Sequence, residues 1–237
     1  MADGGASVNG RTVELRNAVE AALAARDKPT AVRVAVEAVS GRRVAVAELY
    51  RDVLHPILVD VGARWQAGER RVWEEHLAAA TVRTIVELVY PEVLRLKATA
   101  KSSGRSVLLA CPPQEAHDLG LRMVADRFDM AGWTAYFLGA DTPPDELVDA
   151  ARELDVDAVA LSSSTHYHRL AVRHLVDELK LRLPGVNVWV GGPAFAHDRE
   201  GWTEDELVDL DVLLDDGGER PGGAAGGGER PGGAAGE

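Results

Sequence analysis

The hydrophobic pattern of the chain changes near residue 100. From Thr12 to Ala100, apolar residues recur every three or four positions, which is the period of helices that each bury one face. From Ser106 onward, short apolar runs alternate with amphipathic stretches, a pattern typical of parallel strands joined by helices. The sequence therefore predicts an α/β protein. A four-helix bundle cap over residues 12–100 precedes a Rossmann-like, flavodoxin-like domain with a five-stranded parallel sheet over residues 101–216.

Breaks in the pattern predict the bounds of the individual elements. Cap helices are expected over Thr12–Arg26, Thr30–Ser40, Val44–Gln66 and Val72–Lys97. Strands are expected over Val107–Ala110, Thr134–Leu138, Ala158–Ser162, Val188–Val190 and Val212–Leu214, with helices over Leu119–Ala131, Pro144–Leu154 and Leu170–Arg182 between them. Pro56 should kink the third cap helix, because proline lacks a backbone donor.

Both ends of the sequence are predicted to be disordered. Residues 1–11 are mostly small and polar, and residues 217–237 contain two copies of the decamer GGERPGGAAG. No helix can be drawn after the fifth expected strand, so the helical cap or a second subunit is expected to cover that edge of the sheet. No apolar run approaches the ~18 residues of a membrane span, and a soluble, cytoplasmic protein is expected.

Charge and cysteine content narrow the classes of partner. The chain has 38 acidic and 26 basic residues, for a net charge of −12, and this balance disfavours binding to a phosphate backbone. Cys111 is the single cysteine, which excludes an internal disulfide and a multi-cysteine metal site. No enzymatic activity and no direct DNA or membrane binding are expected of this chain.

A carboxylate and an imidazole follow the first expected strand. Glu115 precedes His117 by two residues, and Asp118 and Gly120 complete the segment. A carboxylate in this position can orient the imidazole and make it more basic, as partners of metal-ligating histidines generally do. The pattern predicts that His117 ligates a metal.

Small residues follow two later strands. Forty-one residues separate Gly120 from Ser162, and 26 residues separate Ser164 from Gly191, which is followed by Gly192. Ligands of parallel sheets bind at the carboxyl ends of the strands. The three separated segments are therefore expected to meet at one edge of the sheet.

These segments resemble the cobalamin-binding signature D/E-x-H-x-x-G, S-x-L, G-G, with Ser164 in place of leucine. A second signature lies in the helical half, where Trp65 is followed after nine residues by Glu75 and His76. It resembles the helical cap of the CarH/LitR-type cobalamin photoreceptors. The resemblance covers nearly all of residues 12–216, and it identifies a member whose sequence shows no MerR-type DNA-binding segment before the cap.

The resemblance implies roles for these residues on the lower side of the cofactor. His117 would be the lower axial cobalt ligand and would displace the dimethylbenzimidazole base, whose tail would lie in a slot between sheet and helices. Glu115 would hold His117, Ser162 would face the tail, and Ser164 would alter the slot wall. The cofactor site implied comprises Trp65, Glu75, His76, Glu115, His117, Asp118, Gly120, Ser162, Ser164, Gly191 and Gly192.

On the upper side, Trp65, Glu75 and His76 would accommodate the adenosyl group of adenosylcobalamin. An indole offers a flat apolar face, and a Glu-His pair supplies hydrogen bonds. Light-sensing relatives have a histidine directly after the tryptophan, where this chain has Gln66. That departure leaves His76, water or another ligand for the upper position after light exposure.

The function implied is a light sensor that signals through oligomerisation or a protein partner. Two alternatives stay open from the sequence: a corrinoid carrier of methyl groups, and a light-independent cobalamin sensor that binds a transcription regulator. A bilin as a second chromophore is also left open, with Cys111 as a residue that could touch or tether it.

Overall fold

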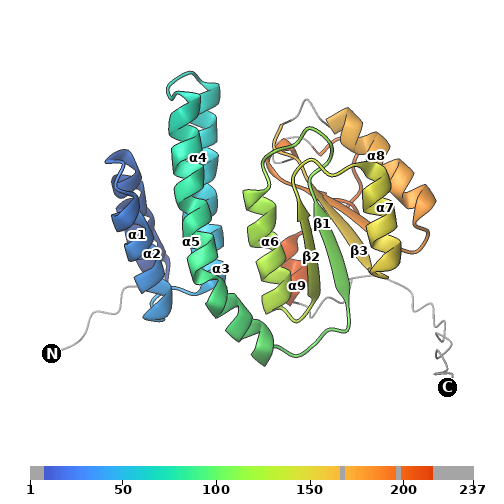
Figure 1. Cartoon of the computed structure of the whole chain (residues 1–237), viewed down its shortest axis with the longest axis horizontal. Coiled ribbons are helices and arrows are strands. Elements are labelled where there is room, and N and C mark those ends of the chain that lie inside the picture. Colours follow the sequence, from blue (N-terminus) through green and yellow to red (C-terminus); the bar gives the residue numbers. More distant parts are fainter. Residues whose placement is uncertain (1–7, 166–168, 196–198, 216–237) are drawn as a thin grey trace.

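The computed structural model describes residues 8–165, 169–195 and 199–215. It places a helical half beside a half built around a parallel sheet (Figure 1). Within these ranges no helix is long and apolar enough to cross a membrane. The tail over residues 217–237, predicted to be disordered, lies outside the described residues.

The helical cap consists of helices that pack side by side. Its elements are α1 (Val8–Ala24), α2 (Lys28–Ser40), α3 (Val46–Glu48), the π-helical segment η1 (Leu49–Leu54), α4 (His55–Gln66) and α5 (Val72–Thr99). The first helix begins at Val8 rather than at Thr12, so the segment predicted to be disordered is too long. Asp27 fixes the start of α2, because its carboxylate accepts the Thr30 backbone N–H at 3.0 Å.

Pro56 is accommodated by a change of helix type directly before it. The elements α3, η1 and α4 follow one another without a break over the predicted helix Val44–Gln66. At the end of η1, the His55 N–H bonds to the Tyr50 carbonyl five residues back, which is the π-helical pattern. This wider turn takes up the missing donor and the bulk of the proline ring.

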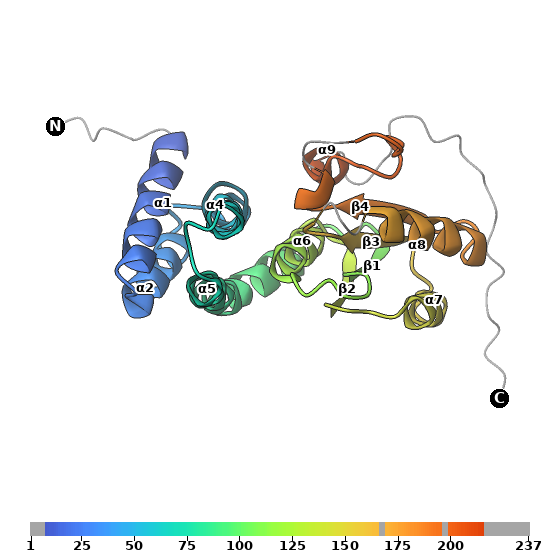
Figure 2. The same cartoon turned by 90° about the horizontal axis from the view of Figure 1, so that it is seen from above.

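The long helix α5 connects the cap to the sheet half (Figure 2). Val82, Ile85 and Val86 are fully buried in the cap core, and Leu119 and Met123 of the next helix pack into the same core. The two halves therefore share apolar packing as well as a covalent link.

The sheet has four parallel strands in the order β2-β1-β3-β4. Its strands are β1 (Ser106–Ala110), β2 (Thr134–Gly139), β3 (Ala158–Ser162) and β4 (Asn187–Gly191). Helices α6 (Leu119–Met130) and α9 (Leu210–Asp215) pack on one face, and α7 (Pro144–Glu153) and α8 (Arg169–Arg182) pack on the other. A short 3-10 turn, η3 (Pro193–Phe195), follows β4.

The predicted fifth strand, Val212–Leu214, is wrong because these residues form part of α9. A run of three apolar residues carries no period that separates a strand from a helix turn. Leu213 is buried against the sheet, and an ion pair between Arg127 and Asp211 joins α9 to α6. At β4 the Val190 N–H bonds to the Glu206 carbonyl at 2.8 Å, so a loop contributes to covering this edge.

Candidate functional site

The candidate site lies where the loops after β1 and β3 diverge. The chain passes from β1 to its neighbour β2 on one side, and later returns to β3 on the other side of β1. Such a switch point leaves an open position at the carboxyl ends of the two strands, where parallel sheets bind ligands. Glu115 and His117 come from the first loop and Ser163 and Ser164 from the second, so the predicted meeting of these segments is confirmed.

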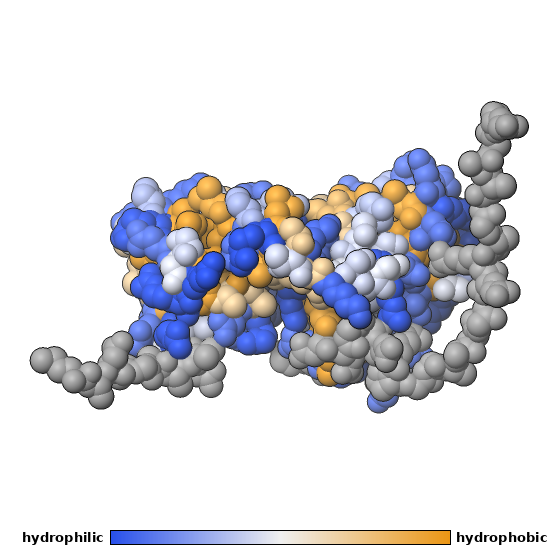
Figure 3. Space-filling model, turned by 90° about the horizontal axis from the view of Figure 1, so that it is seen from below, coloured by the Kyte–Doolittle hydropathy of each residue, from blue (hydrophilic) through white to orange (hydrophobic). Residues whose placement is uncertain are grey.

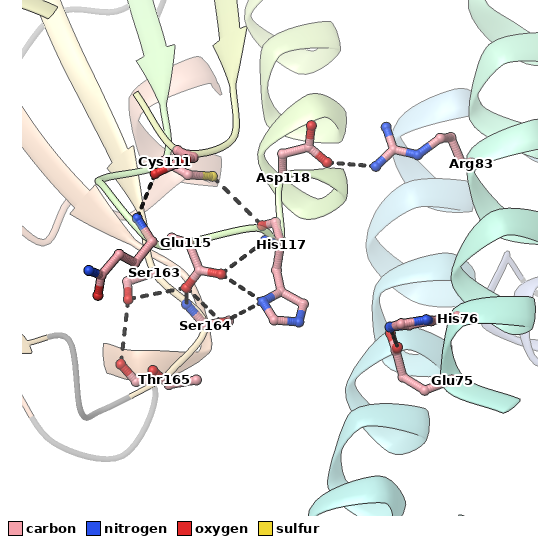
Figure 4. Close-up of polar contacts among 12 residues, drawn as sticks. Glu75, His76, Arg83, Cys111, Glu115, His117, Asp118, Ser163, Ser164 and Thr165 are labelled. Carbon is pink, nitrogen blue, oxygen red and sulfur yellow. Dashed lines mark hydrogen bonds and ion pairs between the residues drawn. The ribbon is translucent and has the colours of Figure 1, made fainter. Parts of the chain in front are cut away.

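Glu115 is the centre of the hydrogen-bond network at this point (Figure 4). Its side chain is only 1% exposed. One carboxylate oxygen, Oε1, accepts the His117 backbone N–H at 2.9 Å and lies 2.6 Å from His117 Nδ1. The other, Oε2, accepts the Ser164 backbone N–H and the Ser164 hydroxyl, both at 2.7 Å. Both oxygens are thereby satisfied inside the protein.

These contacts decide the charge of the pair. Burial by itself would raise the pKa of Glu115, but hydrogen bonds from His117 and Ser164 outweigh it and lower the pKa to about 2. The hydrogen bond to Glu115 raises the pKa of His117 against the opposing effect of burial. With Nδ1 directed to an ionised carboxylate, Nε2 is the imidazole nitrogen left for a metal.

Ser164 contacts the histidine as well as the carboxylate. Its hydroxyl lies 3.0 Å from His117 Nδ1, while the neighbouring Ser163 hydroxyl is 3.5 Å from Glu115 Oε2. The sequence assigned Ser164 only to a slot wall, and it missed Ser163. The serine at position 164, where the motif has leucine, was the sequence signal for this contact. A hydroxyl in place of an apolar side chain requires a polar partner when it is buried.

Gly191, the last residue of β4, and Gly192, which follows it, have different surroundings. Gly192 has φ +99°, and a Cβ there would lie 2.5 Å from the Ser163 carbonyl oxygen, so the chain's own backbone requires this glycine. A Cβ on Gly191, or on Gly120 at the start of α6, would meet no heavy atom within 4 Å. Of these two glycines, only Gly191 therefore leaves room for a ligand to approach the backbone closely.

The cap presents Glu75 and His76 across from His117 (Figure 4). His76 Nε2 lies 3.4 Å from a carboxylate oxygen of Glu75 on α5, and the charge of Glu75 contributes to the raised pKa of His117. Trp65 lies in the last turn of α4, where its side chain is 41% exposed, and Gln66 ends that helix. The upper residues predicted from the sequence are thus all on the α4–α5 hairpin.

A surface groove of about 670 Å³ runs along α5 beside this pair. Its lining residues are Lys28, His76, Ala79, Ala80, Arg83, Thr84, Glu87 and Leu88. Arg83 in this groove donates to Asp118 Oδ1 at 2.6 Å, which links the cap to the residue after His117. Asp118 therefore contacts the cap through Oδ1, while its Oδ2 lies beside Gly139 at the end of β2.

Cys111 is unsuited to tether a chromophore. It is fully buried, and its thiol lies 3.7 Å from the His117 carbonyl oxygen. Burial, followed by the charges of Glu115 and Asp118, raises its pKa to about 12, so the reactive thiolate is disfavoured. The tethering role that the sequence left open is not supported by this geometry.

The described residues fit a corrinoid. Such a cofactor needs one imidazole nitrogen below the metal, which His117 offers, and close backbone approach, which Gly120 and Gly191 permit. Two family models, each described as a B12 binding domain, match residues 15–90 and 105–219. The HTH-type transcriptional repressor CarH of Myxococcus xanthus is 33% identical over 180 residues, which cover 76% of this chain and 58% of the repressor. The chain belongs to the family of proteins built from B12 binding domains, and it is similar to CarH.

Corrinoid proteins are also similar to this member of the family. Trimethylamine corrinoid protein 1 of Methanosarcina acetivorans is 26% identical over 187 residues, covering 78% of this chain and 84% of the relative. The solved structure of the Methanosarcina barkeri monomethylamine corrinoid protein superposes with a TM-score of 0.70 at 17% identity, over 86% of this chain and 99% of the other. This likeness supports the fold, a helical cap followed by a Rossmann-like domain.

The chain spans less than two thirds of the curated repressors, 58% of CarH and 37% of the HTH-type transcriptional repressor CarA of the same organism. The names of these relatives describe regulators and corrinoid proteins. The two matched B12 binding domains identify a cobalamin-binding chain, as the sequence predicted.

Proposed function

We propose that the protein is a light sensor that holds adenosylcobalamin between the helical cap and the carboxyl edge of the sheet. This cofactor supplies a cobalt–carbon bond that visible light breaks. The observation that carries the proposal is the position of His117 opposite the Glu75–His76 pair of α5. One imidazole is thus available below a corrin, and polar groups are available above it.

On the lower side, His117 is the cobalt ligand through Nε2. The buried Glu115 carboxylate and the Ser164 hydroxyl hold the ring through Nδ1. This arrangement fixes the ring orientation and increases the basicity of the ligating nitrogen. Ser162 and Gly191 are direct partners in the register of β3 and β4, and they face the nucleotide tail that His117 displaces.

On the upper side, Trp65 packs against the adenosyl group while Glu75 and His76 bond to its hydroxyl or amine groups. Gln66 follows Trp65 and offers an amide rather than an imidazole. His76 has a 73% exposed side chain, and it is the upper-face histidine we propose for the cobalt position after light exposure.

The output is a change in cap packing. Trp65 and the Glu75–His76 pair would contact the adenosyl group in the dark state only, so its loss would shift the balance between two arrangements of the helices. Large exposed apolar side chains are concentrated on the cap, among them Val72, Trp73 and Leu88. The face in Figure 3 likewise has apolar groups gathered over the helical half. Such a surface supports signalling through self-association or a protein partner.

The experiment is reconstitution with adenosylcobalamin, followed by absorption spectra and solution mass in darkness and after green light. We expect light to change both the spectrum and the assembly size. Trp65→Ala should weaken adenosylcobalamin binding, and Trp202→Ala, far from the cap in sequence, is the matched control. Identical spectra and identical mass before and after illumination would contradict the sensor.

A corrinoid carrier of methyl groups is the second candidate. It is favoured by the coverage of the trimethylamine corrinoid protein, 84% of which aligns with this chain. A carrier has no need of an adenosyl pocket. Preference for methylcobalamin over adenosylcobalamin, unaffected by Trp65→Ala, would support the carrier over the sensor.

A further inference from the structure

Trp189 of β4 has a buried donor without an acceptor. The side chain is 4% exposed, and Nε1 has no hydrogen-bond partner among residues 8–165, 169–195 and 199–215. A buried N–H that has given up water without gaining an acceptor is unfavourable, and it is uncommon in folded proteins. The indole therefore has an unused capacity to bind an acceptor.

The register of the sheet places this indole beneath the predicted tail site. Ser162 pairs with Gly191 at the ends of β3 and β4, and Ala160 pairs with Trp189 two residues earlier in each strand. Alternate residues of a strand share a face, and two residues span roughly 7 Å. Trp189 and Ala160 therefore form the next layer below the residues proposed to face the nucleotide tail.

The same face is the one that packs against α6 and α9. Trp189 belongs to an apolar cluster with Leu213 of α9, and its ring stacks on Phe128 of α6 with ring centroids 6.0 Å apart and 4° between the planes. Trp133 meets it edge-on at 6.0 Å. The aromatic cluster thus holds the indole rigidly from the side opposite the strand ends.

Above this layer the residues are small. Ala160 and Ser162 are the β3 residues on this face of the sheet. A Cβ added to Gly120 or to Gly191 would meet no heavy atom within 4 Å. Gly120 is four residues before Val124, whose side chain packs against the aromatic cluster, so both lie on the helix face toward the sheet. Small residues from three elements therefore form the layer next to a buried indole that lacks an acceptor.

We infer that Trp189 is the floor of the site for the cofactor's nucleotide tail, and that its indole N–H donates to an acceptor of that tail. The inference rests on the proposed binding of cobalamin with its base displaced by His117. A displaced base has a ring nitrogen with a free lone pair, and the tail also carries ribose and phosphate oxygens. Any of these acceptors loses water on entering the site and requires a donor there.

The test compares two corrinoids, aquacobalamin and cobinamide, of which cobinamide lacks the nucleotide tail. Trp189→Phe keeps an aromatic ring against Phe128 and removes only the donor and some ring area. We expect this variant to bind aquacobalamin about tenfold more weakly, as for loss of one buried hydrogen bond, and to bind cobinamide with unchanged affinity. Trp133→Phe makes the same chemical change in the same cluster and should leave both affinities unchanged.

A second variant approaches the same space from β3. Ala160→Leu should reduce aquacobalamin binding and spare cobinamide binding, and it stands in for Trp189→Phe if that variant does not fold. Unchanged aquacobalamin affinity, or an equal loss for both corrinoids, would overturn the role of Trp189 while leaving the proposed function intact. A wild-type protein that binds neither corrinoid would overturn the proposed function itself.

Discussion

Arg83 and Asp118 form an ion pair of 2.6 Å between the helical cap and the residue directly after His117. Arg83 lies on α5, in the same groove as His76, and Asp118 precedes the first residue of α6. A movement of α5 that follows a change above the cofactor must therefore either break this pair or pull on the loop that holds His117. The pair therefore connects helix α5 of the cap directly to the loop that carries His117.

Arg83→Gln should loosen the loop that carries His117. The side chains of Arg83 and Asp118 are 48% and 17% exposed, so the pair contributes modestly to stability and its loss should not unfold the protein. We expect faster amide hydrogen exchange over residues 115–119 and little change in melting temperature. Arg33→Gln, which breaks the exposed pair with Glu37, is the control. Equal exchange in both variants would show that Arg83 does not restrain the loop.

His117→Ala should remove the proposed lower ligand. Affinity for cobalamin is expected to fall by at least about tenfold, since changes even to partners of a metal-ligating histidine have effects of this size. The bound cofactor should also lose the spectral signature of imidazole nitrogen coordinated to cobalt. His174→Ala, at an exposed position on α8, should change neither property. An unaltered spectrum in His117→Ala would exclude this histidine as the ligand.

Ser164→Ala should weaken cobalamin binding more than Ser163→Ala does. The Ser164 hydroxyl donates to Glu115 at 2.7 Å, whereas the Ser163 hydroxyl is 3.5 Å from the same oxygen. Loss of the shorter bond frees one side of the carboxylate that orients His117, and an effect of about tenfold is expected. Titration of each variant with aquacobalamin measures the difference, and equal affinities would assign Ser164 to packing alone.

Tyr50→Phe should destabilise the junction between the two halves. The Tyr50 hydroxyl donates to Asp126 Oδ2 at 2.8 Å in a buried position, where Asp126 also pairs with Arg122. Removal of one donor to a buried carboxylate is expected to lower the free energy of unfolding by about 1–3 kcal/mol. Thermal and urea unfolding measure the loss, and Tyr136→Phe on the partly buried strand β2 is the comparison. A loss no larger than in Tyr136→Phe would mean that Arg122 alone satisfies the carboxylate.

Glu206 should make stability depend on pH in the acid range. Hydrogen bonds from Arg173 outweigh burial, and with those from Lys180 they lower its pKa from 4.5 to about 2. Because the folded-state pKa is the lower one, the contribution is present above pH 4.5 and is lost as the pH falls towards 2. Glu206→Gln should therefore be less stable than wild type at pH 7. The two stability curves should converge near pH 2, and a constant gap down to that pH would contradict the assignment.

The sequence by itself determined the order of the helical half and the sheet half, and it predicted most of the residues that meet at the carboxyl edge of the sheet. Helix and strand periods reflect which residues are buried, and this is readable from local pattern over the long elements α5 and α8. The spacing of Glu115, His117, Ser162 and Gly191 likewise predicted one site, because the carboxyl ends of parallel strands meet at one edge. The matches to B12 binding domains confirm the cobalamin-binding family that the sequence predicted.

Only the tertiary structure decided features that depend on contacts between distant segments. The run Val212–Leu214 became a helix because Leu213 packs against the sheet face, and a three-residue run has no period of its own. Ser164 joined Glu115 because two loops diverge at the same switch point. Gly192 is required by the Ser163 backbone rather than by a ligand. Local sequence specifies which side chains are present, whereas the packing of α6, β3 and β4 specifies which of them meet.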